Sequence, residues 1–210
     1  MGWFGRKSDS SGKNQGNQRT IRSSRGWGET LTFLKDREGL RVLDFGATSP
    51  GNINYLTELG HSFYMANVVE EATKQDWFSS GEDGKQAFDA ERFAAANFDF
   101  AGREFDAVLL WDTADYLPPP LVPILFSKLR EALHPGGRLL AFSHGKQAGP
   151  ETQFSRYHIT DRSEVELQPV GDFPVQGVYQ TRQIEGFLNG YSDVRFYLGK
   201  DNTREIIAVR

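Results

Sequence analysis

The sequence has no cysteine among its 210 residues and no long apolar run. Without thiols, disulfide frameworks, thiolate zinc sites and cysteine nucleophiles are all excluded. No apolar stretch approaches the roughly 20 residues that a membrane-spanning helix requires. The start of the chain lacks the apolar segment of a secretory signal peptide, and Arg6 departs from the myristoylation pattern. These absences predict a cytoplasmic protein without a transmembrane segment.

The net charge differs in sign between the first 25 residues and the rest of the chain. The chain carries 24 Lys and Arg against 28 Asp and Glu, a formal net charge of −4. Residues 1–25 carry a net charge of +5, so the remainder carries −9. The basic side chains of the first segment are Arg6, Lys7, Lys13, Arg19, Arg22 and Arg25. An acidic body gives no strong nucleic-acid signal, because binding a phosphate backbone requires clustered positive charge.

The first 25 residues predict a flexible basic tail, and residues 26–210 predict one folded domain. The tail is rich in Gly, Ser, Asn and Gln and has few side chains to bury. Two interpretations fit this composition. The tail is either a solvated arm that aids solubility, or a weak contact with an anionic surface into which Trp3 and Phe4 insert.

Apolar patterning in the domain alternates between strand-like and helix-like segments. The strand-like segments are residues 41–45, 61–68, 105–111 and 138–143, and the helix-like segments are residues 30–36, 52–59 and 121–133. Residues 70–96 are mostly helical in pattern, with an interruption near 79–84 and the least marked strand of the chain. Such alternation implies right-handed βαβ crossovers and a mostly parallel sheet.

The end of the chain departs from this alternation. Residues 181–189 predict a helix that Thr181 caps and Gly190 ends. Two strand-like segments, 193–198 and 204–209, then flank the turn-forming sequence Gly-Lys-Asp-Asn. This spacing is typical of an antiparallel β-hairpin, so the parallel sheet is predicted to finish in one.

An acid stands at the end of the first of these strands, directly before a glycine. Nicotinamide-binding domains normally have an apolar residue at the position of Asp44, because a carboxylate repels the diphosphate, and their G-x-G-x-x-G fingerprint is missing here. S-adenosylmethionine (SAM) carries an ammonium, a sulfonium and a carboxylate but no phosphate. An acid beside bare backbone amides therefore suits SAM, whereas the structural alternative is that Asp44 caps the loop or the next helix.

Three segments taken together resemble class I SAM-dependent methyltransferases. They are residues 42–46 (VLDFG), 105–112 (FDAVLLWD) and 133–140 (LHPGGRLL), which match the first, fourth and fifth strand motifs of that family in order and spacing. The terminal hairpin is similar to the family's sixth and seventh strands. The resemblance covers roughly residues 27–210. It implies an α/β fold with a seven-stranded, mostly parallel Rossmann-like sheet, helices on both faces and a C-terminal antiparallel hairpin.

The resemblance also implies which residues line the cofactor site. Asp44 and Gly46 would border the methionine moiety, and Asn67 stands where the family has an acid that binds both ribose hydroxyls. An amide can replace those hydrogen bonds but loses their charge assistance. The full set implied to bind SAM is Asp44, Gly46, Ala47, Thr48, Asn67, Asn97, Phe98 and Asp112.

The loop after the first strand departs from the family's Gly-x-Gly-x-Gly pattern. Thr48 and Pro50 replace the second and third glycines, which normally permit close backbone approach. Two readings follow. Either the loop takes a different path, in which Thr48, Ser49 and Gly51 supply the lost contacts, or the site is degenerate and no longer binds SAM tightly.

The methyl acceptor is less well marked. Residues 112–116 lack the Asn/Asp-Pro-Pro-Tyr/Phe signature of enzymes that methylate exocyclic amines of nucleobases. Candidate general bases are His144 and His158, although a lone histidine is more often a packing or loop residue. Residues 145–180 predict either a lid over the acceptor or an irregular surface segment. No His, Asp and Glu set has metal-ligand spacing.

These patterns lead to one principal hypothesis and two alternatives. The principal hypothesis is a SAM-dependent methyltransferase that acts on a small-molecule acceptor. The first alternative is a non-catalytic methyltransferase-like binding or regulatory domain with a degenerate SAM site. A nicotinamide oxidoreductase is the third, and the loop sequence disfavours it.

Overall fold

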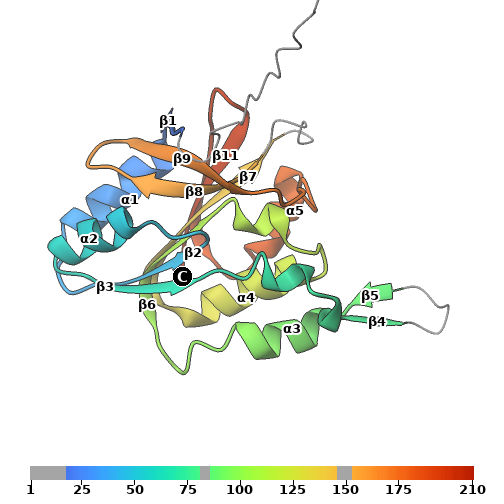
Figure 1. The fold of residues 1–210 in the computed structure, drawn as a ribbon. Coiled ribbons are helices and arrows are strands. Elements are labelled where there is room, and N and C mark those ends of the chain that lie inside the picture. The colour runs from blue at the N-terminus through green and yellow to red at the C-terminus, as the bar shows by residue number, and fades with distance from the viewer. Residues whose placement is uncertain (1–17, 81–85, 146–152) are drawn as a thin grey trace, which may run out of the picture.

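A computed structural model describes residues 18–80, 86–145 and 153–210, and its centre is a six-stranded sheet. The strand order is β10 (Ser192–Leu198), β11 (Thr203–Val209), β7 (Leu133–His144), β6 (Phe105–Trp111), β2 (Arg41–Phe45) and β3 (Ser62–Ala66). Strands β7, β6, β2 and β3 are parallel, whereas β11 and β10 join the edge antiparallel. The mostly parallel sheet with a terminal antiparallel hairpin is therefore confirmed (Figure 1).

The central sheet has six strands in the described residues, where the sequence predicts seven. The segment expected to hold the additional strand forms two 3₁₀ turns, Glu71–Thr73 and Gln75–Trp77, followed by a short ribbon and a helix. The ribbon of β4 (Phe78–Ser80) and β5 (Gln86–Phe88) projects from the body (Figure 1), and α3 (Ala90–Asn97) follows it. Aromatic rings of the segment pack on Phe93 of α3 instead of lining a sheet edge.

Helices cover both faces of the sheet. Successive strand residues point to opposite sides, and because the side chains on both sides are apolar, each face packs against helices. Val42 and Leu109 belong to one apolar cluster with α1 (Arg25–Lys35) and α2 (Pro50–Glu58). Leu43 and Leu110 belong to a second cluster with α3, α4 (Leu121–Ala132) and α5 (Thr181–Phe187). None of the helices in the described residues is long and apolar enough to span a membrane.

The atypical loop after β2 serves as the start of α2. Ser49 caps the helix by accepting a hydrogen bond from the backbone N–H of Gly51 at 3.1 Å, and Pro50 occupies the first helical turn. Proline suits that position, since its missing N–H would have no partner there and its φ is already helical. Helix initiation thus accounts for Pro50 in place of the third glycine of the family's pattern, with Ser49 as the capping residue.

A separate three-stranded sheet, of order β1-β9-β8, forms a third layer beside α1 and α2. Its strands are β1 (Thr20–Ser23), β9 (Glu164–Gly171) and β8 (Phe154–Ile159), all antiparallel. The structure therefore differs from two expectations. Residues 20–25 form β1 and begin α1 rather than a flexible tail, and within 145–180 the strands β8 and β9 pair with each other rather than forming an irregular segment. Residues 1–17 of the predicted tail, with Trp3 and Phe4, lie outside the described residues.

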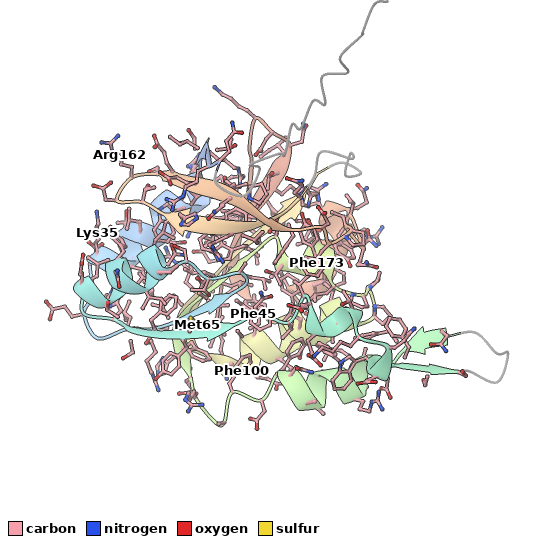
Figure 2. The ribbon with its side chains drawn as sticks, in the orientation of Figure 1. Lys35, Phe45, Met65, Phe100, Arg162 and Phe173 are labelled. Atoms are coloured by element: carbon pink, nitrogen blue, oxygen red, sulfur yellow. The ribbon has the colours of Figure 1, made fainter. Side chains whose placement is uncertain are left out.

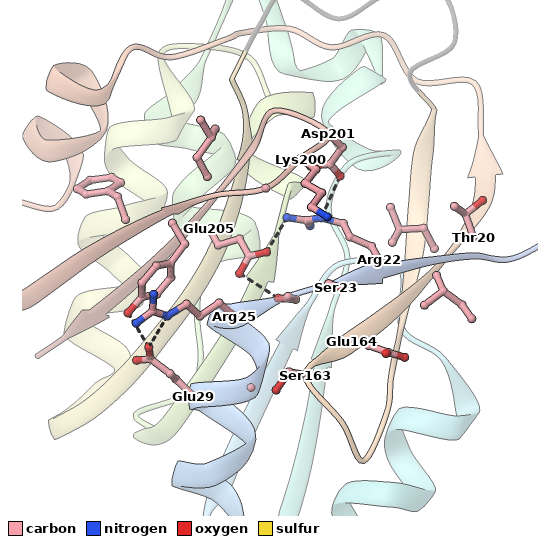
Figure 3. A pocket seen from close by; sticks show the side chains of 18 of the residues that line it. Thr20, Arg22, Ser23, Arg25, Glu29, Ser163, Glu164, Lys200, Asp201 and Glu205 are labelled. Atoms are coloured by element: carbon pink, nitrogen blue, oxygen red, sulfur yellow. Dashed lines mark hydrogen bonds and ion pairs between the residues drawn. The ribbon is translucent and has the colours of Figure 1, made fainter.

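A buried ion pair joins β1 to the central sheet (Figure 3). The Arg22 guanidinium donates to the Glu205 carboxylate of β11 at 2.8 Å, and both side chains are almost fully buried. Glu205 also accepts hydrogen bonds from the Ser24 hydroxyl and from the backbone N–H of Gly26. The carboxylate therefore holds the start of α1 as well as β1, which explains why Arg22 is not a solvated tail residue.

We expect Glu205→Gln to destabilise the fold, because it removes the buried counterion of Arg22 and leaves that side chain only the half-exposed Asp201, whose carboxylate lies 3.0 Å from Nε. Removing one partner of a buried pair costs about 3–5 kcal/mol. The measurement is the free energy of unfolding in urea. The matched control is Glu166→Gln, which removes the exposed partner of Arg19 in the same small sheet and should cost less than about 1 kcal/mol. Equal losses in the two variants would contradict the anchoring role of Glu205.

Candidate functional site

A cleft of about 570 Å³ opens at the carboxyl ends of β2 and β3. One wall comes from the loop after β2 and the end of β3, and the other from β8, β9 and the segment that follows β9. The lining residues are Gly46, Ala47, Thr48, Met65, Ala66, Asn67, Glu70, Phe154, Arg156, Val170, Gly171, Asp172 and Phe173. Figure 2 labels Met65 and Phe173. Such a volume is ordinary for a small-molecule or cofactor site, and the carboxyl ends of parallel strands are where open α/β sheets bind ligands.

The cleft combines an apolar wall with a few polar groups of different charge. Asn67 and Glu70 stand at the end of β3, and Arg156 projects from β8. The Nε of Arg156 is buried and has no hydrogen-bond partner within the part of the chain that the structure describes. A guanidinium N–H in that state calls for an acceptor, and a ligand carboxylate is the acceptor whose geometry and charge match it best.

Asp44 lies directly behind the cleft rather than in its lining. Its carboxylate is fully buried and accepts hydrogen bonds from Trp111 Nε1 at 2.6 Å and from Asn52 Nδ2 at 3.3 Å. The Asn52 amide also binds the backbone of β8, since Nδ2 donates to the carbonyl of Tyr157 and Oδ1 accepts from the N–H of Ile159. Asp44 therefore joins β2, β6 and α2, and through Asn52 it helps fix the cleft wall that β8 provides.

Trp111 occupies an uncommon backbone conformation at the end of β6. Its φ is +53°, a left-handed value that is strained for a bulky side chain. The ring is held on both sides: it stacks on Tyr157 at 4.8 Å between centroids and donates to Asp44. A Cβ on Gly46 would lie 3.2 Å from Trp111 and 3.0 Å from Thr113, so the glycine permits this close approach.

A second polar cluster follows β6. Asp112 is buried, and the Tyr157 hydroxyl donates to its carboxylate. Burial raises the pKa of Asp112 to about 6, and the nearby charge of Asp115 adds to the effect. Asp115 is also fully buried and lies 2.7 Å from Nδ1 of His144, at the end of β7. Acids and a histidine thus gather one strand further along the sheet edge from the cleft.

The structure brings together part of the predicted site. Gly46, Ala47, Thr48 and Asn67 line the cleft. Asp44 and Asp112 are buried behind the sheet edge, where they contact protein groups. Asn97 and Phe98 end α3 and lie outside the lining: the Asn97 amide donates to the carbonyl of Phe93, and Phe98 packs in the core against Phe45 and Phe93. The adenine role that the resemblance implies for these two residues has no support in their positions.

Sequence reasoning missed the polar groups that the smaller sheet and the β3 loop supply. Glu70 follows Asn67 by three residues, so the sequence does contain an acid close to the strand end, one turn beyond the position that the family resemblance indicates. Arg156 and Asp172 reach the cleft only because β8 and β9 fold back over it. Nothing in their local pattern indicates that return.

The other histidines have structural surroundings. His61 lies buried with Nε2 3.2 Å from the carbonyl of Leu34. His158, one of the two predicted bases, is a strand residue of β8 whose Nε2 is 2.9 Å from the amide oxygen of Gln168. Burial lowers its pKa. No group of three His, Asp or Glu side chains within the described ranges is arranged to hold a metal ion.

Comparison with known proteins gives a family match. The family model described as "Methyltransferase domain" matches residues 19–161, more than half of the chain. No curated protein has a matching sequence.

Solved structures with a similar arrangement include three bacterial proteins. Magnesium protoporphyrin IX methyltransferase of Synechocystis PCC 6803, solved with bound SAM, is 16% identical with a TM-score of 0.50 over 88% of this chain and 77% of that chain. A 1,6-didemethyltoxoflavin-N1-methyltransferase of Burkholderia thailandensis, solved with S-adenosylhomocysteine, is 13% identical with a TM-score of 0.47, over 89% and 79%. TehB of Haemophilus influenzae is 13% identical with a TM-score of 0.48, over 87% and 62%, so the chain spans less than two thirds of TehB.

The burial of Asp44 predicts a pH dependence of stability. Burial raises its pKa from 3.8 to about 6, although the hydrogen bond from Trp111 opposes the rise. The folded protein therefore holds this proton more tightly than the unfolded chain, and the free energy of unfolding falls as the pH rises from about 4 to about 6. A shift of this size corresponds to about 3 kcal/mol.

The measurement is urea unfolding of the wild type and of Asp44→Asn, which has no titrating group at this position. We expect the wild-type free energy of unfolding, relative to the variant, to decrease by up to about 3 kcal/mol between about pH 4 and about pH 7. Trp111→Phe removes the hydrogen bond that favours the carboxylate, so the decrease should extend to higher pH. A difference that does not change with pH would refute this account of Asp44.

Proposed function

This chain belongs to the methyltransferase-domain family, and on that premise we propose that it transfers a methyl group from SAM to a small-molecule acceptor. The observation that carries the proposal is the cleft at the carboxyl ends of β2 and β3, with its carboxylate, amide and guanidinium groups. SAM supplies a methyl group on a sulfonium, whose positive charge makes the methyl carbon electrophilic. The protein then needs mainly to position the acceptor against it.

The chemistry of the lining fits the polar groups of SAM. Glu70 and Asn67 can accept hydrogen bonds from the two ribose hydroxyls, with the Glu70 carboxylate supplying the charge assistance that Asn67 lacks. Arg156 can bind the carboxylate through the Nε that has no protein partner within the described residues. The apolar surfaces of Met65 and Phe173 suit the adenine ring. In this proposal the ribose acid sits one turn beyond the strand end.

A small acceptor suits the charge of the body better than a nucleic acid. Residues beyond 25 carry a net charge of −9, which repels a phosphate backbone. The solved Synechocystis methyltransferase is named for a porphyrin acceptor, and its likeness to this chain extends to the fold. We therefore propose a small organic acceptor without assigning its identity from any relative.

A non-catalytic domain is the competing proposal, and one observation favours it. The acid of the first strand, which the resemblance places beside the methionine moiety, is committed to Trp111 and Asn52. A domain that has lost its cofactor could retain Asp44 for this structural purpose alone. Cofactor binding distinguishes the two proposals directly.

Calorimetric titration of S-adenosylhomocysteine into the purified protein tests the proposed function. We expect binding in the micromolar range, weakened about tenfold or more in Glu70→Gln, because a hydrogen bond to a charged group contributes about 1.5–3 kcal/mol. The matched control is Glu71→Gln. Glu71 is the next residue, but its carboxylate bonds to Lys74 and Trp77 and does not line the cleft. We expect its affinity to stay within about twofold of the wild type.

Two results would count against the proposal. Absence of binding by a folded wild-type protein would favour the non-catalytic domain. Equal weakening by the two substitutions would show that Glu70 does not contact the ligand, and the ribose assignment would then be wrong.

A further inference from the structure

The buried Asp115 and the partly buried His144 form a pair that the cofactor cleft does not use. Oδ2 of Asp115 accepts from the backbone N–H of His144 at 2.6 Å and lies 2.7 Å from its Nδ1, while Oδ1 accepts from the Ser143 hydroxyl at 3.2 Å. The carboxylate is thus fixed by groups of one strand end. With Nδ1–H directed at Asp115, Nε2 is the nitrogen of the neutral ring that carries the lone pair.

Three polar atoms close to this pair are buried without a hydrogen-bond partner among the described residues. They are Oδ1 of Asp112 and the hydroxyls of Tyr116 and Tyr179, which are each at least nine-tenths buried. Both tyrosines lie close enough to Asp115 to feel its charge. Burial is the main cause of the raised pKa of Tyr116 and of Tyr179, and the negative charge of Asp115 raises both further. Buried polar groups are rarely left unpaired, so these atoms indicate polar groups of a ligand or of water bound with it.

Aromatic rings connect the pair to the cofactor cleft. Phe154 lines the cleft and packs edge-on against Tyr116 at 5.0 Å between centroids. Tyr116 in turn packs edge-on against His144 at 6.0 Å. Phe173, also of the cleft lining, packs on the other side of Phe154 at 5.5 Å. Tyr116 and Phe154 are buried and pack on one another, so the surroundings of His144 on this side are aromatic. Such surroundings favour an aromatic acceptor over a strongly hydrated one.

We propose that His144 is the general base that deprotonates a phenolic hydroxyl of the acceptor, and that Asp115 is its positioning residue. The proposal rests on the proposed methyl transfer and adds a substrate class, the phenols. The side chain of His144 is 19% exposed, so a ligand can reach it, whereas Asp115 is fully buried and touches no ligand.

The proton and electron balance of the step is simple. The phenolic oxygen gives its proton to Nε2 of His144 and a lone pair to the methyl carbon. The bond from that carbon to sulfur breaks with its electron pair on sulfur, which yields an aryl methyl ether and the neutral thioether S-adenosylhomocysteine. The imidazolium then returns its proton to water. Positioned bases of this kind contribute about 10²–10⁴-fold to rate.

The charges around His144 set the pH range in which it acts as a base. Burial alone lowers its pKa, but the hydrogen bond that Nδ1–H donates to Asp115 and the charges of Asp112, Asp115 and Asp201 outweigh burial and raise it. The nearby Arg204 guanidinium is bonded to the carbonyls of Tyr179 and Gly145. The base form is therefore lost as the pH falls through a pKa above the ordinary value of 6.5, and methylation should fall with it.

The test uses the full chain and two phenols. In 4-methylphenol the hydroxyl stays protonated near neutral pH, whereas 4-nitrophenol is substantially ionised and needs no base. We expect His144→Ala to lower kcat/KM for 4-methylphenol at least 100-fold and for 4-nitrophenol much less, with added imidazole restoring part of the first rate. Asp115→Asn should lower kcat about tenfold at unchanged KM and move the acidic limb of the pH profile to lower pH. His158→Ala is the control histidine and should change neither rate.

Two measurements without turnover separate this proposal from the proposed function. Calorimetry of S-adenosylhomocysteine should give the same affinity for the wild type and His144→Ala. Nitrogen NMR should show His144 as the Nδ1-protonated tautomer at high pH, with a pKa that Asp115→Asn lowers. Cofactor binding without methylation of either phenol, or an unchanged 4-methylphenol rate in His144→Ala, would overturn the base assignment alone. Absence of cofactor binding by the wild type would overturn both proposals.

Discussion

The hydrogen bond from Trp111 to Asp44 is the contact on which the sheet edge depends. It joins the ends of β2 and β6 across 67 residues of sequence, and it compensates a buried carboxylate in a region that is otherwise apolar. The left-handed backbone of Trp111 is the strain that this arrangement requires. Because Asn52 extends the same network to β8, the contact also determines where the third layer lies over the cleft.

The third layer gives the cleft what the central sheet cannot. The loop after β2 and the end of β3 offer mainly backbone and an amide, whereas β8 and β9 add Arg156 and the apolar Phe154. The opposite edge of that layer, strand β1, is anchored to the central sheet by the ion pair between Arg22 of β1 and Glu205 of β11. Residues 20–25, which by composition belong to a solvated tail, are thus held in the fold by the buried carboxylate of Glu205.

Local sequence predicted the central sheet well and the site only in part. Strands such as 41–45 and 105–111 are short apolar runs whose burial on both faces fixes their identity. Residues 20–23 carry one buried side chain in four, so their pairing with β9 depends on a partner more than 140 residues away. The same limit applies to Arg156 in the cleft and to Asp115, which meets His144 only when β6 and β7 align. Long-range pairing, rather than propensity, decides these positions.

The four buried carboxylates of the described chain divide according to their partners. Asp44 and Glu205 each accept hydrogen bonds from groups that do not titrate near neutral pH, and these hydrogen bonds hold strands together. Asp112 keeps one oxygen without a partner in the described residues, and Asp115 faces a histidine that can gain or lose a proton. A core that serves stability alone gains nothing from burying the second pair, since apolar residues of similar volume would cost less. Proton transfer therefore best explains why Asp112 and Asp115 are buried after β6. Strand anchoring best explains the burial of Asp44 in β2 and Glu205 in β11.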